Sequence, residues 1–105
     1  MDDNVKLIMK WDILPEKDQE YFEFVVREWV PGVTRLGIET SGAWLTVYSR
    51  DEKTPKIMAE GIAEDIKSMR HILKSDQWST LHDRLMDYVE NYSHKVVPVN
   101  GEFQF

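Results

Sequence analysis

The chain has 105 residues, of which 42% are hydrophobic and 11% aromatic, so it can fold as one domain and is not a disordered protein. Its formal net charge of -6 disfavours nucleic-acid binding, and no run approaches the roughly 20 apolar residues of a membrane span. The absence of cysteine excludes disulfides and thiolate chemistry. The acidic start has no apolar signal segment, so we expect a single cytoplasmic domain over residues 1–105.

The first predicted element is a strand from Val5 to Ile13, because every odd position of this segment is apolar. Pro15 follows and predicts the start of a helix, where a missing backbone N–H does no harm. The apolar stripe of this helix has helical spacing and comprises Phe22, Val25, Val26 and Trp29. We expect Pro31-Gly32 to end the helix.

A second alternating segment, from Ala43 to Tyr48, predicts the second strand. The polar segment from Arg50 to Pro55 is typical of a hairpin loop, and residues Lys56 to Ala63 predict a third strand. One face of this third strand carries small residues, which would let a helix lie close or leave space beside the sheet: Ala59, Gly61 and Ala63.

Asp65 is predicted to cap a second helical segment, which Ser75-Asp76 is expected to interrupt and restart. Beyond the restart, spacings of three and four predict a helix through Trp78, Leu81, Leu85, Tyr88, Val89 and Tyr92. Ser93-His94 is expected to close this helix. Lys95 to Val99 then predicts a fourth strand, and Pro98 places that strand at an edge of the sheet.

The predicted order β-α-β-β-α-β favours an α+β, ferredoxin-like fold, a four-stranded antiparallel sheet with two helices on one face. In this arrangement the first and third strands are central, and the second and fourth are edges. The other face would carry a mixed set of side chains: Lys6, Ile8, Lys10, Asp12, Met58, Glu60 and Ile62, with Trp44 and Tyr48. Because this face is more apolar than a monomer normally exposes, we predict a homodimer that pairs through it. A solvated face is the alternative.

This succession of elements resembles the dimeric α/β barrel superfamily, in its antibiotic-biosynthesis-monooxygenase-like and stress-response branches. The most specific local likeness is the segment Leu73-Lys74-Ser75-Asp76-Gln77-Trp78, followed by Leu81 and Leu85. The resemblance implies a homodimeric barrel. The superfamily includes cofactor-free monooxygenases, haem-degrading enzymes, isomerases and members with no known activity.

His82 is the candidate catalytic residue, because a histidine one turn after Trp78, at the margin of the apolar stripe, can move a proton. The alternative is a half-buried packing role. His71 is interpreted as a surface residue and His94 as a partner of the helix dipole. The candidate substrate-binding residues are aromatic side chains that could wall an apolar cavity: Trp11, Trp44, Tyr48 and Trp78. Alternatively these rings belong to the core and the dimer interface.

Three functions therefore stay open. The first is a cofactor-free, monooxygenase-like enzyme that orients the anion of a small aromatic or apolar substrate and excludes water. The second is a non-catalytic stress-related or interaction module whose sheet face serves only dimer assembly. The third is haem binding through His82, although Trp78 and His82 are closer than in haem-degrading members and Asn4 precedes the strand. We expect no metal, no cofactor, and no nucleic-acid or membrane partner.

Overall fold

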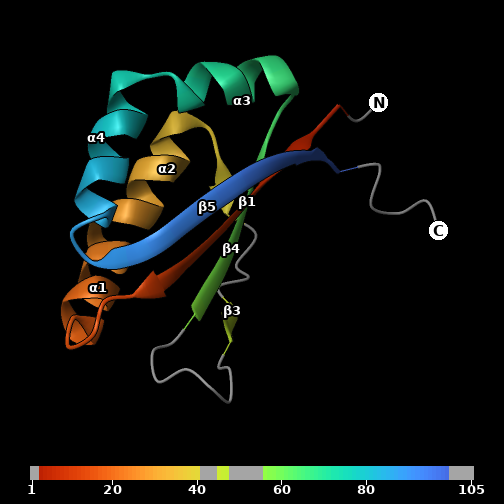
Figure 1. Ribbon diagram of the computed structural model, residues 1–105. Helices are drawn as coiled ribbons and strands as arrows, with labels where there is room; N and C mark the ends of the chain where they lie inside the picture. The colour runs from red at the N-terminus through yellow and green to blue at the C-terminus, as the bar shows by residue number, and fades with distance from the viewer. Residues whose placement is uncertain (1–2, 41–44, 48–55, 100–105) are drawn as a thin grey trace.

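The computed structural model describes residues 3–40, 45–47 and 56–99, with residues 45–47 and 56 described by their backbone alone. Figure 1 shows one twisted antiparallel sheet with the helices gathered on one of its faces. The strands are β1 (Val5–Ile13), β2 (Glu39–Thr40), β3 (Leu45–Val47), β4 (Lys56–Ala63) and β5 (Val89–Pro98). The helices are α1 (Asp18–Phe24), the π-helical η1 (Val25–Trp29), α2 (Val30–Leu36), α3 (Ile66–Leu73) and α4 (Asp76–Leu85).

The strand order is β2-β4-β1-β5, and β3 also pairs with β4. The first and third predicted strands are therefore central, and the predicted ferredoxin-like α+β fold is confirmed. Strand β1 pairs with β4 from Val5–Ala63 to Asp12–Lys56. Of the predicted second strand, β3 is described, whereas Ala43, Trp44, Tyr48 and the hairpin loop lie outside the described residues.

The core lies between the sheet and the helices. All five odd-numbered residues of β1 are buried there, at exposures of 6% or less: Val5, Leu7, Met9, Trp11 and Ile13. The small face of β4 also points to this side, and a Cβ added at Gly61 would overlap Ile38 Cγ2. Gly61 therefore makes room for Ile38, in the segment that joins α2 to β2.

Pro15 lies in a turn before the first helix, so the prediction that it begins the helix is wrong. The Lys17 N–H donates to the Leu14 carbonyl oxygen over 3.1 Å, and Glu16 has a φ of 67°. This geometry is that of a type II turn, in which proline favours the second position and the third needs a positive φ. Helix α1 consequently begins at Asp18.

The first helical region does not end at Pro31-Gly32, as predicted, but continues to Leu36 and closes at Gly37, whose φ is 106°. The hydrogen-bond register changes in the π-helical turn η1, directly before α2. Pro31 therefore lies in the first turn of α2, where its missing backbone N–H breaks no helical hydrogen bond. Gly32 serves packing, because a Cβ there would lie 2.8 Å from Leu81 Cδ2 of α4. The glycine thus lets α2 and α4 approach closely.

The restart of the second helical region is confirmed. The side chain of Asp65 accepts a hydrogen bond from the Ser68 N–H over 2.7 Å at the start of α3. Ser75 Oγ accepts one from the Trp78 N–H over 3.2 Å at the start of α4. Both caps satisfy backbone donors that the helix itself leaves unpaired.

Helix α4 ends at Leu85, and β5 begins at Val89, so the prediction of a helix to Tyr92 and a strand from Lys95 is wrong. The register between β1 and β5 shifts between Lys10 and Asp12, which marks a β-bulge. The bulge contains one extra residue, so Val89 and Tyr92 lie on the same face although they are three apart in sequence. Their spacing therefore imitates a helix.

None of the described helices combines the length and the apolar character that crossing a bilayer requires.

Candidate functional site

Five aromatic rings between the helices and the sheet form a closed circuit, which we call the five-ring cluster. The ring centroids are separated by 6.0 Å for Trp11–Trp29, 5.5 Å for Trp29–Trp78, 6.1 Å for Trp78–His82, 4.6 Å for His82–Tyr92 and 5.9 Å for Tyr92–Trp11. Four separate elements contribute to it: β1, η1, α4 and β5. Three of the predicted site residues, Trp11, Trp78 and His82, thus lie together.

The local structure explains why these rings converge. Trp11 belongs to the buried alternation of β1, and η1 places Trp29 against it. The cap at Ser75 positions Trp78 in the first turn of α4, and His82 follows one turn later on the same face.

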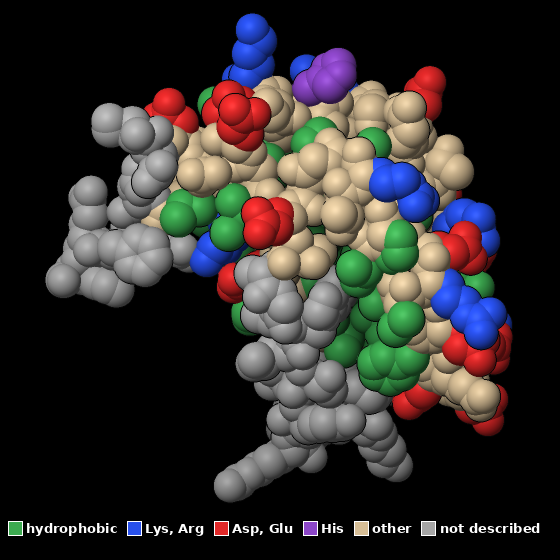
Figure 2. Space-filling model, turned by 180° about the vertical axis from the view of Figure 1, so that it is seen from behind, with side chains coloured by type: hydrophobic (Ala, Val, Ile, Leu, Met, Phe, Trp, Pro, Cys, Tyr) green, Lys and Arg blue, Asp and Glu red, His purple; other side chains and the backbone are tan. Residues whose placement is uncertain are grey.

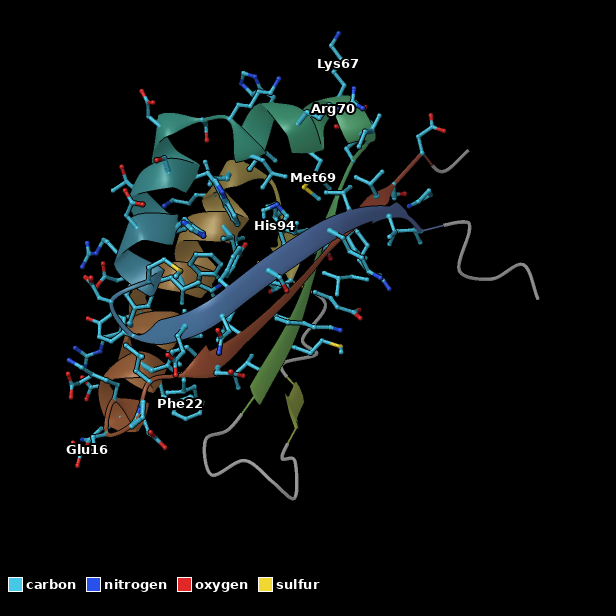
Figure 3. The ribbon with its side chains drawn as sticks, in the orientation of Figure 1. Glu16, Phe22, Lys67, Met69, Arg70 and His94 are labelled. Atoms are coloured by element: carbon cyan, nitrogen blue, oxygen red, sulfur yellow. The ribbon has the colours of Figure 1, made fainter. Side chains whose placement is uncertain are left out.

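The β-bulge positions the fifth ring. Asn91 adopts a φ of 59° in the bulge, and its side-chain amide donates to Asp12 Oδ2 over 2.9 Å. With this extra residue in place, Tyr92 and His94 both face the helices. Figure 3 shows the His94 side chain between β5 and the helical layer.

Tyr92 and His94 form a hydrogen-bonded pair at the rim of the five-ring cluster, with 2.9 Å between the Tyr92 hydroxyl and His94 Nδ1. Burial raises the pKa of Tyr92 above its usual range. Burial, followed by the charge of nearby His82, lowers the pKa of His94. Both shifts favour the neutral form of the side chain.

The two inner tryptophans differ in how their indole N–H groups are satisfied. Trp11 Nε1 donates to the Tyr21 hydroxyl over 2.9 Å, and burial raises the pKa of Tyr21. Trp29 Nε1 is buried and has no hydrogen-bond partner in the described part of the chain.

The open face of the sheet carries a separate hollow of about 430 Å³ beside the bulge. Its lining includes Lys10, Asp12, Met58, Asn91 and Ser93. Figure 2, which shows the molecule from behind, displays acidic, basic and hydrophobic side chains intermixed on its surface. The backbone of Trp11 borders this hollow, whereas the Trp11 ring packs on the helix side of the sheet.

The other predicted residues have different outcomes. Trp44 and Tyr48 lie outside the described residues. His71 is exposed on α3, as predicted, but His94 lies within β5 and not at a helix end. Sequence reasoning missed Trp29, Tyr92 and His94 as site residues. The signal that could have found the last two is the alternation of Tyr92, His94 and Val96 with polar or outward-facing residues.

The described residues offer few side chains that could bind a metal ion or haem together. Within residues 3–40 and 56–99, no three His, Asp or Glu side chains gather closely enough to hold a metal ion. The ring of His82 is flanked by those of Trp78 and Tyr92, with centroids 6.1 and 4.6 Å away. The Asn4 side chain donates to the Ala63 carbonyl oxygen over 3.4 Å, at the opposite end of β1 from Trp11.

Solved structures of low sequence identity share this architecture. SnoaB, a cofactor-independent oxygenase from Streptomyces nogalater, matches with a TM-score of 0.66 and 14% identity over 92% of this chain and 93% of that chain. A NIPSNAP family protein from Agrobacterium tumefaciens matches with a TM-score of 0.67 and 14% identity over 93% and 87%. An ethyl tert-butyl ether D (EthD) family protein from Bacillus halodurans matches with a TM-score of 0.68 and 18% identity over 89% and 95%.

No protein-family model matches the chain, and no curated protein matches it in sequence. At identities this low the structural likeness establishes the fold alone. The chain has the fold of the dimeric α/β barrel superfamily, as the sequence predicts.

Proposed function

We propose that the protein is a cofactor-free, monooxygenase-like enzyme acting on a small aromatic substrate at the five-ring cluster. The observation that carries this proposal is the position of His82 beside the Tyr92–His94 pair, over the walls formed by Trp11 and Trp78. Aromatic walls favour a planar apolar ligand, and an imidazole side chain can accept a proton.

The proposed roles follow from which atoms are already engaged. His94 Nδ1 is occupied by the Tyr92 hydroxyl, so His82 is the imidazole that remains to take a proton from the substrate. The substrate anion then gives its electrons to dioxygen. For a naphthol the balanced reaction is one naphthol and one dioxygen to one naphthoquinone and one water. The protein orients the anion and keeps water away from it.

The open face of the sheet supports the homodimer that we propose together with this activity. Ile8, Met58, Ile62 and Val97 are half-buried there, next to the 3.3 Å ion pair of Lys6 and Glu60. Proteins of this superfamily form dimeric barrels. A two-fold arrangement would bury this mixed face against itself.

Oxygen consumption with a naphthol tests the activity. The wild-type protein is expected to consume oxygen in a one-to-one ratio with the naphthol, and His82→Gln should slow this by about a hundredfold. His71→Gln is the matched control, because His71 is exposed on α3, and it should keep the wild-type rate. Equal rates in the two variants would exclude His82 as the base.

The alternative function is a non-catalytic interaction module that uses the open face only for assembly. The close packing of the five rings on one another favours it, since a packed core needs no ligand. A stable dimer that neither binds naphthol nor consumes oxygen would support this alternative.

A further inference from the structure

The buried N–H of Trp29 is the feature from which we infer a ligand contact. Trp29 is 0% exposed, and its Nε1 has no acceptor in the described part of the chain. The neighbouring indole of Trp11 does have an acceptor, the Tyr21 hydroxyl. Because a buried donor without a partner costs stability, nearly all such groups in native proteins are paired, many of them with water or a ligand.

The position of this donor within the five-ring cluster is informative. The Trp29 ring contacts Trp11 at 82° and Trp78 at 56°, deep between η1, β1 and α4. His82 and Tyr92, by contrast, are only half-buried and form the outer side of the cluster. The Trp29 N–H therefore lies at the inner end of the cluster, with the rings of Trp11 and Trp78 between it and the half-buried His82 and Tyr92.

We propose that Trp29 Nε1 donates a hydrogen bond to an oxygen atom of the bound ligand, and that the ligand is a planar aromatic ketone or phenol. This inference rests on the proposed function, because it uses the same cluster. The inner end offers a donor, so it selects ligands with an acceptor oxygen over hydrocarbons of the same shape. In the free protein a buried water supplies the same acceptor chemistry, and the ligand oxygen displaces it.

Two ligands of one skeleton test the inference with the full chain. Tetralone carries a carbonyl acceptor and no donor, whereas tetralin lacks the oxygen. Binding of each is measured by titration, and the indole N–H signals are followed by NMR with nitrogen-labelled tryptophan. Tetralone should bind more tightly than tetralin, and it alone should shift the Trp29 N–H signal.

The decisive variant replaces Trp29 with benzothienylalanine, a ring of nearly the same shape with sulfur in place of the N–H group. It should weaken tetralone binding by about three- to tenfold and leave tetralin binding unchanged. Trp29→Phe, checked by thermal unfolding, is the second variant and should show the same selective loss.

The outcomes separate this inference from the proposed function. If both ligands bind but the variants weaken them equally, or not at all, Trp29 is not the donor and only this inference fails. The same holds if the Trp29 N–H keeps its contact with water when tetralone saturates the protein. If neither ligand binds the wild-type protein, the five-ring cluster is not a ligand site, and the proposed function fails as well.

Discussion

The two faces of the sheet differ sharply although the same strands build both. On β1, Leu7 is fully buried under the helices, whereas its neighbour Ile8 is half-buried on the open face. The helix-covered face holds the core and the five-ring cluster. The open face holds the Lys6–Glu60 ion pair, scattered apolar side chains and a hollow. The alternation along one strand thus separates the residues that make the fold from those available to a partner.

Substitutions at Leu7 and Ile8 test the difference between the two faces most directly. Leu7→Ala should lower the free energy of unfolding by about 2–5 kcal/mol, because it leaves a cavity among residues that cannot collapse fully. Ile8→Ala should cost about 1 kcal/mol or less when measured at high dilution. Urea denaturation of both variants checks the difference. Equal losses would mean that the open face is as tightly packed as the core.

A charge on the open face should affect assembly and not folding. Ile8 lies between Glu60 and Lys95 in the sheet register, and in a two-fold dimer each substitution occurs twice. Ile8→Asp should therefore raise the dimer dissociation constant by about a hundredfold, as measured by analytical ultracentrifugation. Val26→Asp is the control, since Val26 is 69% exposed on η1, away from the sheet. A loss of dimer in the control alone would place the interface on the helices.

The smallest expected effect concerns pH. Because the pKa of His94 is lowered in the folded protein, the unfolded chain takes up a proton first as the pH falls through about 6.5. The contribution of His94 to stability is therefore complete above that pH and is lost below it. Urea unfolding from about pH 8 to about pH 5 should show a shallower decline for His94→Gln than for the wild-type protein. Parallel curves would show that His94 titrates alike in both states.

The sequence predicts most of the fold because periodicity reports which face of an element is buried. The alternation from Val5 to Ile13 and the caps at Asp65 and Ser75 depend on local chemistry, and all three predictions are confirmed. Two local signals were misread, because Pro15 lies in a turn before α1 and Pro31 lies inside α2. The effect of Pro31 depends on the π-helical turn before it, and no residue type in the sequence indicates that turn.

The site was less predictable, since it depends on contacts between distant elements. Trp11, Trp78 and His82 could be chosen as aromatic or titratable residues on apolar faces. Tyr92 and His94 were missed although they alternate with Ser93 and Lys95, because the bulge at Asn91 made the strand spacing look helical. The orphaned N–H of Trp29 becomes visible only when every neighbour of the ring is known.

The π-helical turn η1 also has a consequence for comparing this chain with others. A π turn holds one residue more than the α-helical turn that it replaces. A protein lacking one residue between Phe24 and Pro31 could keep both flanking helices in place with an uninterrupted α-helix. Alignments through this segment should accordingly allow a gap of one residue. Without that gap, the residues on one side of η1 would be aligned with the wrong positions.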